Sequence, residues 1–544
     1  MLKNWINIFL FHIKNNKLFT ALNVLGLSIG IAGLIFAILY WNDEQSYDQW
    51  NPEKEKVFKV LSDIGKDVIW STNPGALEPY LKSDSRIANV VYHDWYQAEV
   101  FKYKGKTHVI NKTFNTQNDF FELFPFETLQ GNVETALSKE NSVAMNEKTA
   151  QKFFGNENPI GKQIIHNKRI VTVTAIYSIP GNSSIAPNII INDMKSSIDE
   201  NKQQWGNFNF AIMIKLKNPN DKAAIEKKIN DLYYQNKTVK ESKSEGISIK
   251  EYINTYGSIT SILDPLSTIR LHSITNGMPE GKGNYQFLMI MVGLSILILI
   301  LSIVNYINLA TANAIKRAKE VGVRKIIGAT RSNIILQFIF ETVLTTLFSI
   351  LLALVIVELS LPYYNNFLGK NLIIFGNQFY VQLIIIFIMT VVVAGIFPAV
   401  YVANFETLKV IKGNFGRSKS GVWIRNGMLI VQFAIASFFI IGSYIVYQQV
   451  NYLANKDLGF VPTRIISVYW DKQNVDFSNE NYSKIIFNNY TRLTSELNKI
   501  KGVQGVSTGT FRFGGGNDSS SSFSYNSQSI QAQNLGIDFN MLDM

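Results

Sequence analysis

The sequence of 544 residues contains no cysteine and only five histidines. Without cysteine the chain has no disulfides, no thiolate metal ligands and no cysteine nucleophile. The histidines, at positions 12, 93, 108, 166 and 272, lack the i, i+4 spacing that places two imidazoles on one helix face for zinc. We therefore predict no metal site and interpret each histidine as a surface or locally bonded side chain.

A phosphate-binding loop is also missing. The nearest approach, GNENPIGKQ at residues 155–163, has five residues between its glycines and ends in Gln. The P-loop needs four residues there and a Ser or Thr for magnesium. HExxH does not occur, the GxSxG spacing at residues 26–30 and 505–509 is given no catalytic assignment, and the glycine-rich residues 513–516 follow no predicted strand. We predict a chain without catalytic or cofactor-binding residues and interpret residues 155–163 as a turn.

Acidic residues are scarcer than basic ones, 41 against 52, which gives a net charge of +11. A nucleic-acid-binding protein would gather such charge on one soluble face. Here many basic residues lie beside apolar runs, an arrangement that orients membrane proteins. We therefore predict no nucleic-acid partner.

What the sequence has in abundance is long apolar runs. About 20 apolar residues cross the roughly 30 Å of hydrocarbon in a bilayer. Five runs reach that length, and we predict spans at residues 18–41, 285–311, 334–362, 379–402 and 428–450. The basic approach to the first run, Lys3, Lys14 and Lys17, also fits a secretory signal. Two acids, Glu341 and Glu358, lie near the ends of the third span, where snorkelling or a partner helix can shield them.

Charges between the spans predict the orientation. The segment between the second and third spans carries six basic residues against Glu320, and residues 403–427 are also basic. The first span instead exits into Asp43, Glu44, Asp48 and Glu53. The positive-inside rule then places both basic segments in the cytoplasm, together with residues 1–17, which we predict to form a helix. The spans themselves are predicted to lie in the cell inner membrane.

Residues 42–284 form an extracytoplasmic segment in this topology, and a segment of that length must be a domain. Strand patterns at residues 171–177 and 211–216 accompany helical patterns at 148–154 and 223–235. Pro180-Gly181-Asn182 marks a turn. The fold class is therefore an α-helical integral membrane protein with a large α+β extracytoplasmic domain.

Residues 451–544 follow the fifth span and are likewise extracytoplasmic in this topology. They are polar and rich in Gly and Ser, and residues 537–542 faintly echo residues 114–121. We interpret them as a partial second outer domain and expect either a truncated chain or a partner that supplies the rest.

The segment of residues 312–333, here called the coupling segment, is the most informative stretch. Helical spacing places Ile315, Ala318, Val321 and Lys325 along one stripe with charges around it. A cytoplasmic extension of the second span with apolar and basic contacts follows from this pattern, and Gly328-Ala329-Thr330 can end it. The alternative is that the charges serve only to orient the spans.

NYINLATA at residues 305–312 leads into RAKEVGVRK at 317–325. By this most specific match, the sequence resembles the permeases of MacB/FtsX-type ABC transporters of Bacteroidota-like bacteria. Further matches are KNNKLF and NVLGLSIG near the first span, DEQSYD after it, NPIGK at 158–162, GIFPA at 395–399 and KDLGF at 456–460. These matches cover nearly the whole chain; the domain they imply for residues 42–284 is a MacB periplasmic core-like domain.

The resemblance implies a permease that binds no ATP itself and works with a separate cytoplasmic ATPase, itself a dimer. Within the coupling segment it assigns ATPase contact to ten residues, among them Val321 and Ile326 as apolar contacts: Lys316, Arg317, Lys319, Glu320, Val321, Gly322, Arg324, Lys325, Ile326 and Gly328. Membrane lipid and periplasmic or outer-membrane proteins are further expected partners.

Two functions agree with the resemblance. The first is export or mechanotransmission, with peptides, antimicrobials, lipids or lipoproteins as cargo classes. The second is a membrane receptor or regulator that controls an envelope protein, such as a cell-wall hydrolase, without moving cargo. Because no cargo pocket can be named from the residues, both remain open at this point.

Overall fold

A computed structural model describes residues 2–65, 68–404, 419–457, 464–468, 481–510, 520–525 and 528–541. The chain forms two compact units, Met1–Gln45 with Asn284–Lys456 and Ser46–Gly283 with Asp457–Met544. We call the first the helical unit, and within the second we call residues 46–283 the α+β domain.

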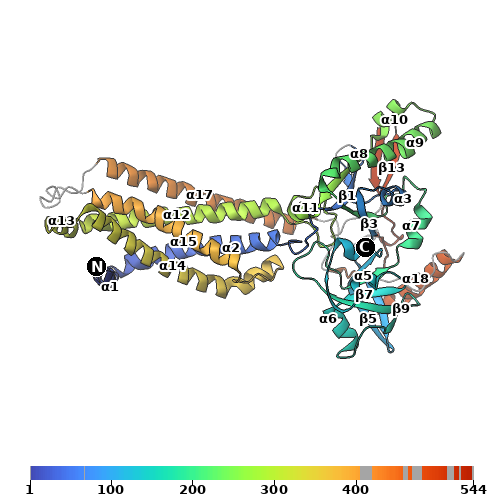
Figure 1. Cartoon of the computed structure of the whole chain (residues 1–544), viewed down its shortest axis with the longest axis horizontal. Coiled ribbons are helices and arrows are strands. Elements are labelled where there is room, and N and C mark those ends of the chain that lie inside the picture. Colours follow the sequence, from blue (N-terminus) through green and yellow to red (C-terminus); the bar gives the residue numbers. More distant parts are fainter. Residues whose placement is uncertain are drawn as a thin grey trace. The chain divides into compact units, whose positions relative to one another are not determined.

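The helical unit contains seven described helices, drawn as a bundle in Figure 1. Five of the described helices are long and apolar enough to cross a membrane, and each of the five expected runs falls within one of them. Of the basic residues 403–427, positions 405–418 lie outside the described residues. The helices are α1 (Leu2–Asn15), α2 (Lys17–Gln45), α12 (Tyr285–Lys316), α13 (Ala318–Ile326), α14 (Arg331–Leu368), α15 (Asn377–Ala403) and α17 (Lys419–Asn455).

Small residues set the closest helix packing in this unit. Helix α2 packs along α12 and α14, and α14 packs along α15. A Cβ atom at Gly30 of α2 would lie 3.1 Å from the Cβ of Ser302 in α12. A Cβ at Gly395 of α15 would lie 3.3 Å from that of Thr342 in α14. Such small residues let helix backbones approach where lipid supplies no hydrophobic drive for association.

The α+β domain is built on one twelve-stranded sheet. Its main path runs β10-β7-β9-β8-β4-β5-β3-β11-β1-β12, with β2 beside β1 and β6 beside β9. The strands are β1 (Val57–Asp63), β2 (Ile69–Trp70), β3 (Ile87–His93), β4 (Gln97–Tyr103), β5 (Lys106–Thr116), β6 (Glu127–Gly131), β7 (Ser142–Asn146), β8 (Gln163–His166), β9 (Arg169–Ser178), β10 (Ile189–Asn192), β11 (Ala211–Leu216) and β12 (Thr260–Pro265).

One part of the sheet closes on itself. Strand β10 pairs antiparallel with β7 and also parallel with β5, so six strands, β10-β7-β9-β8-β4-β5, form a ring. Alternate side chains of these strands point inward, as the two-residue period requires. A buried cluster that includes Phe101, Val143, Val173 and Ile191 fills the interior together with Phe153 of α6 (Glu147–Phe154).

The other part is an antiparallel sheet of β3, β11, β1 and β12, buried on both faces. On one face, Phe58 and Val60 pack with Ile225 and Ile229 of α8 (Lys222–Tyr233). On the opposite face, Val57 joins a second, aromatic-rich cluster. The remaining helices are η1 (Gly75–Leu77), α3 (Glu78–Lys82), α4 (Phe120–Leu123), α5 (Val133–Ala136), α7 (Lys195–Asn201), η2 (Pro219–Asp221), η3 (Tyr234–Thr238), α9 (Val239–Ser244), α10 (Ile249–Tyr256) and α11 (Leu266–His272).

Local sequence patterns in this domain gave correct elements. The predicted strands at 171–177 and 211–216 are β9 and β11, and the predicted helices at 148–154 and 223–235 are α6 and α8 continued by η3. Residues 155–163 follow α6 as turns up to β8, which confirms that interpretation. Gly155 itself caps α6 with φ of 60°, a left-handed conformation that favours glycine.

The described part of residues 457–544 repeats an order found in the α+β domain. Helix α18 (Tyr482–Asn498) precedes the hairpin of β13 (Ser520–Tyr525) and β14 (Gln528–Gln533). An antiparallel bridge joins Gly509 to Ile537 across this hairpin, as the pair His93 and Thr116 is joined across the β4–β5 hairpin. The glycine-rich residues 513–516 lie outside the described residues.

Candidate functional site

The coupling segment forms a helix–elbow–helix. Helix α12 ends at Lys316, Arg317 leaves helical geometry with ψ of 1°, and the nine-residue α13 follows. Gly328 then takes φ of 100°, and the Thr330 side chain caps α14 by accepting a hydrogen bond from the Asn333 N–H. The predicted break at residues 328–330 is confirmed. The predicted continuous helical stripe is wrong, because the helix is interrupted at Arg317.

An ion pair inside the bundle holds the elbow. The Arg317 guanidinium donates two hydrogen bonds to the Glu341 carboxylate of α14, at 2.8 and 3.0 Å. Both side chains are nearly buried, with 10% and 14% exposure. The guanidinium also lies 4.9 Å from the centre of the Phe338 ring. Of the two expected ways to shield Glu341, snorkelling or a partner helix, the structure shows a partner: Arg317, at the elbow between α12 and α13, in a two-pronged pair with fixed geometry.

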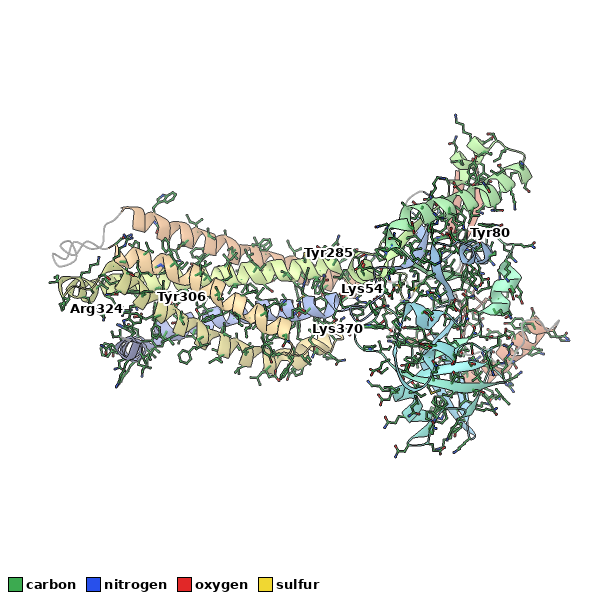
Figure 2. All side chains as sticks on the ribbon, viewed as in Figure 1. Lys54, Tyr80, Tyr285, Tyr306, Arg324 and Lys370 are labelled. Carbon is green, nitrogen blue, oxygen red and sulfur yellow. The ribbon has the colours of Figure 1, made fainter. Side chains whose placement is uncertain are left out.

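Further polar contacts bind α13 to its neighbours. Arg324 donates to Gln337 of α14 at 2.6 Å and to Glu320 one turn earlier at 2.5 Å. Lys325 donates to the backbone carbonyl of Ala403, at the end of α15, at 2.9 Å. Figure 2 shows Arg324 at this end of the helical unit, with Tyr306 further along the bundle. The coupling segment is thus attached to both α14 and α15.

Val321 was predicted to contact an ATPase, and the structure corrects this assignment. Its side chain is 2% exposed and packs with Ile334, Val402 and Ala403. It is therefore part of the bundle core, and a docking partner could reach it only if α13 were displaced. The physical reason is the elbow, which turns this face of α13 toward α14 and α15.

Exposed aliphatic side chains lie at the end of α13. Val323, Ile326 and Ile327 are 52%, 62% and 81% exposed. Ile326 was predicted as an apolar contact, whereas Val323 and Ile327 were not. We call these three residues the α13 patch.

The remaining predicted residues have mixed positions. Glu320 is half-buried between Arg317 and Arg324, and Gly322 lies within α13. Gly328 forms the turn described above. The side chains of Lys316 and Lys319 lie outside the described residues, although their backbone belongs to α12 and α13.

A small polar cavity of about 70 Å³ adjoins the ion pair within the bundle. Its lining includes His12 of α1, Asn23 of α2 and Tyr306 of α12, besides Arg317 and Glu341. The Tyr306 hydroxyl lies 3.0 Å from that of Thr342. His12 was not predicted to lie here, and burial lowers the pKa of its imidazole.

A second polar cluster ties the opposite end of the helical unit. The Lys370 ammonium donates to Asp43 at 2.6 Å and to Glu44 at 2.8 Å, joining the link between α14 and α15 to the end of α2. From the sequence, Asp43 and Glu44 were identified only as charges that follow the first span, without a partner. Because α2 is continuous with the chain that enters the α+β domain, this cluster lies on a covalent path into that domain.

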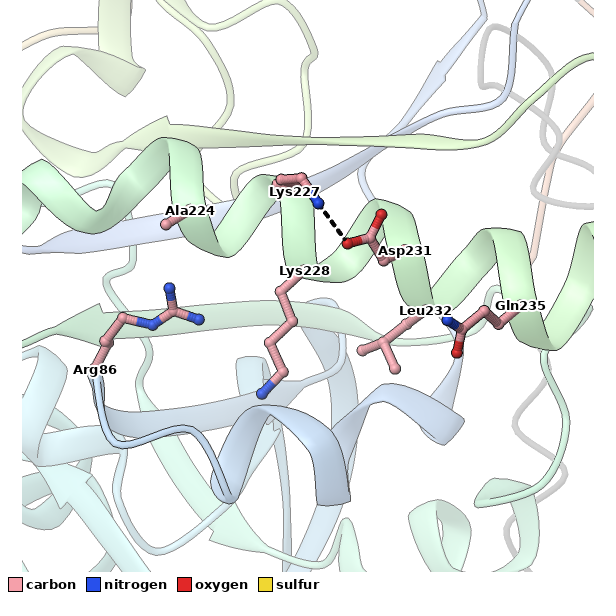
Figure 3. A pocket seen from close by; sticks show the side chains of 7 residues that line it. All are labelled: Arg86, Ala224, Lys227, Lys228, Asp231, Leu232 and Gln235. Carbon is pink, nitrogen blue, oxygen red and sulfur yellow. Dashed lines mark hydrogen bonds and ion pairs between the residues drawn. The ribbon is translucent and has the colours of Figure 1, made fainter.

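A shallow groove of about 310 Å³ in the α+β domain carries several cations (Figure 3). Its charges are already paired. Arg86 and Lys228 both donate to Asp84, at 2.7 and 2.9 Å, and hold the pKa of that carboxyl well below its usual range. Lys227 donates to Asp231 at 2.9 Å. We therefore assign no ligand to this groove.

The histidines and acidic residues that the structure describes form no cluster suited to binding a metal ion. No group of three or more His, Asp or Glu side chains among them is arranged to hold a metal ion. His166 is buried, pairs with Glu99 and stacks on the Phe101 ring with centres 4.6 Å apart. His93 is fully buried and its Nδ1 lies 2.9 Å from the carbonyl of Asp94.

Together, several spanning helices and an α+β domain define a multi-spanning membrane protein with a large domain outside the bilayer. Two family profiles match the chain in this order. Residues 20–232 match a MacB-like periplasmic core domain, and residues 292–406 match an FtsX-like permease C-terminal domain. The chain belongs to the MacB/FtsX-type ABC transporter permeases, and the α+β domain is extracytoplasmic.

Relatives of known name agree with this assignment. The macrolide export ATP-binding/permease protein MacB of Aggregatibacter actinomycetemcomitans is 24% identical over 363 residues, covering 61% of this chain and 49% of that protein. The MacB of Mannheimia succiniciproducens is 20% identical over 417 residues, covering 73% and 59%. The chain thus spans about half the length of the first of these relatives.

Solved structures similar to this chain are isolated domains. A permease-protein domain from Porphyromonas gingivalis aligns with a TM-score of 0.33 and 16% identity, covering 39% of this chain and 91% of that domain. The periplasmic region of MacB from Actinobacillus actinomycetemcomitans aligns with a TM-score of 0.26 and 18% identity, covering 39% and 90%.

Proposed function

We propose that the chain is a non-catalytic permease subunit that couples ATP hydrolysis by a separate cytoplasmic ATPase dimer to movement of its α+β domain. The observation that carries this proposal is the α13 patch. Three neighbouring aliphatic side chains are exposed at the end of a segment that carries several charges. Exposed apolar side chains that cluster beside charges suit a groove on a partner protein.

The attachments of α13 support a mechanical role. A force applied to the α13 patch acts on α14 through Arg317 and Arg324, and on α15 through Lys325. At the other end of these helices, Lys370 joins their link to α2. Closure of an ATPase pair can thus move α2, and with it the chain that enters the α+β domain, without any cargo path through the bundle.

The proposal also covers the location of the protein and its partners. The protein spans the cell inner membrane with its N-terminus and coupling segment in the cytoplasm and the α+β domain in the periplasm. ATP binds to the partner ATPase, so the chain itself needs no cofactor. Lipid surrounds the five spans, and periplasmic or outer-membrane proteins are further partners. Peptides, antimicrobials, lipids and lipoproteins are the cargo classes to screen by stimulation of ATP hydrolysis.

Site-specific photo-crosslinking tests the docking step. A photoreactive phenylalanine analogue replaces Ile327, and the matched control carries it at Leu359, which is 71% exposed on α14 within a spanning helix. After irradiation of native membranes, mass spectrometry should identify an ATP-binding protein attached at position 327 but not at 359. Adducts at 327 with lipid alone, or with no ATP-binding protein, would contradict the proposal.

Variants that remove apolar side chains from the α13 patch test whether this patch is needed for ATP hydrolysis. The pair Ile326→Ser and Ile327→Ser should reduce ATP hydrolysis by the co-purified complex by about tenfold or more, since buried aliphatic contacts of this size contribute about 1.5–3 kcal/mol each. Ile170→Ser in β9 of the α+β domain, where Ile170 is 58% exposed, is the control and should leave hydrolysis unchanged. Equal activity in both variants would favour the receptor or regulator function instead.

A further inference from the structure

A buried lysine lies at the centre of the α+β domain. Lys59 occupies the middle of β1, with Met213 of β11 opposite on one side and Asp264 of β12 opposite on the other. Its neighbours in sequence, Phe58 and Val60, face the α8 side of the sheet, so Lys59 faces the aromatic-rich side. Its side chain is fully buried. Lysine is almost never buried to this extent without a partner.

The amine of Lys59 has no hydrogen-bond partner among the described residues. It lies 5.1 Å from the centre of the Trp95 ring, a weak attraction for a cation. Asp264 does not form an ion pair with it, and its carboxylate instead accepts a hydrogen bond from the Ser273 hydroxyl at 2.6 Å. His93 of β3 is also fully buried, and its Nε2 has no partner in the described part of the chain.

The segment of residues 273–283, here called the return segment, covers the amine. A Cβ atom at Gly277 would lie 2.6 Å from the Lys59 Nζ and 2.3 Å from the Ser71 Cβ, so only glycine fits there. Further along, Arg270 holds the segment by donating to the carbonyls of Glu280 and Gly281, at 3.2 and 3.1 Å. The return segment ends one residue before Asn284, which leads into α12.

Charged groups around Lys59 decide which of its protonation states is favoured. Burial lowers the pKa of Lys59 to about 7, and the carboxylate of Asp264 only partly opposes this. Burial lowers the pKa of His93 to about 3, so this imidazole stays neutral. Burial raises the pKa of Asp264. The hydrogen bond from Ser273 and the positive charges of Lys59, Lys222 and Lys282 act in the opposite direction. Met213 of β11, Trp95 and Gly277 also lie next to Lys59, and none of them carries a charge.

We propose that Lys59 is a proton-controlled switch in the α+β domain, in which protonation of the buried amine releases the return segment that closes over it. A neutral amine fits the dry site under Gly277. An ammonium ion there loses its hydration without gaining an ion pair, which is unfavourable. Moving the return segment away would let water or the Asp264 carboxylate reach it. This inference concerns the domain itself and does not depend on ATPase docking.

The direction of the pH effect follows from proton counting. With the return segment closed, Lys59 binds its proton only below about pH 7, whereas a solvated lysine binds it below about pH 10.4. Between these values the closed form carries one proton fewer, so closure becomes more favourable as pH rises and less favourable as pH falls. The opening equilibrium should increase by up to about tenfold for each pH unit lowered in this window.

Hydrogen exchange of the full-length protein in lipid nanodiscs tests the switch. Protection of amides in the return segment, corrected for intrinsic exchange, is measured between pH 7 and 9. In the wild type, protection should fall by up to about 100-fold over these two units as pH is lowered. Lys59→Met should remove this dependence and keep the segment protected at pH 7. Lys102→Met, at an exposed lysine of β4, should behave like the wild type.

A second variant keeps the test decisive if Lys59→Met does not fold. Asp264→Asn removes the nearest negative charge, which lowers the pKa of Lys59 further, so the onset of protection should move to lower pH. A flat profile in the wild type would overturn the proposal. The same pH dependence in Lys59→Met as in the wild type, or a shift to higher pH in Asp264→Asn, would overturn it equally.

Discussion

At the scale of single residues, Arg317 and Glu341 show how far a sequence can be interpreted. An acid inside an apolar run indicates that a partner is required, because an unpaired carboxylate is costly at membrane depth. The identity of the partner was missed, since Arg317 was counted among the charges that orient the spans. It lies 24 positions away, and only the packing of the elbow between α12 and α13 against α14 brings the two together.

This ion pair provides a quantitative prediction. Removing one member, by Arg317→Met or Glu341→Gln, should destabilise the helical unit by about 3–5 kcal/mol, because the remaining charge is buried without a partner. The double variant should lose much less than the sum of the single losses. Chemical denaturation in detergent, arranged as a double-mutant cycle, measures the coupling.

The exposed pair Lys227 and Asp231 on α8 is a suitable comparison, with side chains 77% and 58% exposed. Coupling in Lys227→Met with Asp231→Asn should be much smaller, since solvent screens the charges. If the Arg317 and Glu341 losses simply added, the pair would not be the feature that holds the elbow.

At the scale of elements, α13 depends on tertiary contacts. A helix of nine residues is too short to be stable alone, because few hydrogen bonds offset the cost of its first turn. Val321 in the core and the bonds of Arg324 and Lys325 hold it in place. Sequence pattern located this helix, but the resemblance assigned Val321 to a partner, whereas packing buries it against α14 and α15.

The crossing of α2 and α12 gives a prediction at this scale. Gly30→Leu should separate these helices and lower stability by about 1–3 kcal/mol, the usual cost of overpacking, because even a Cβ there meets the Ser302 hydroxyl at 2.6 Å. Thermal unfolding in nanodiscs measures the change. Gly33→Leu is the matched control, as nothing lies within 4 Å of a Cβ at that position. Equal shifts for both variants would mean that helix propensity, and not packing, sets the effect.

At the scale of the whole molecule, the topology is directly testable because the chain has no native cysteine. Lys106→Cys, at the exposed first residue of β5 in the α+β domain, should react with an impermeant maleimide in cells with a permeabilised outer membrane. Ile327→Cys, in the α13 patch, should react only after the inner membrane is opened. The reason is the basic character of the coupling segment, which favours the cytoplasmic side.

Each cysteine variant also serves as the other's control, since both residues are well exposed and differ only in the expected side. Reaction of Ile327→Cys in intact inner membranes would invert the proposed orientation. Loss of reaction at Lys106→Cys in the same cells would have the same meaning.

The sequence by itself determined the properties that depend on local composition. Run length and loop charge gave the number of spans and their expected orientation, and residue periodicity gave β9, β11, α6 and α8. Tertiary structure decided the pairings between distant residues. Helix packing joins Arg317 to Glu341, and strand register buries Lys59 in a strand, VFKVLSD, whose alternation alone would allow lysine to face solvent. The physical reason is that a chain's apolar content is carried by each segment, whereas the partner of a charge is set only when segments pack.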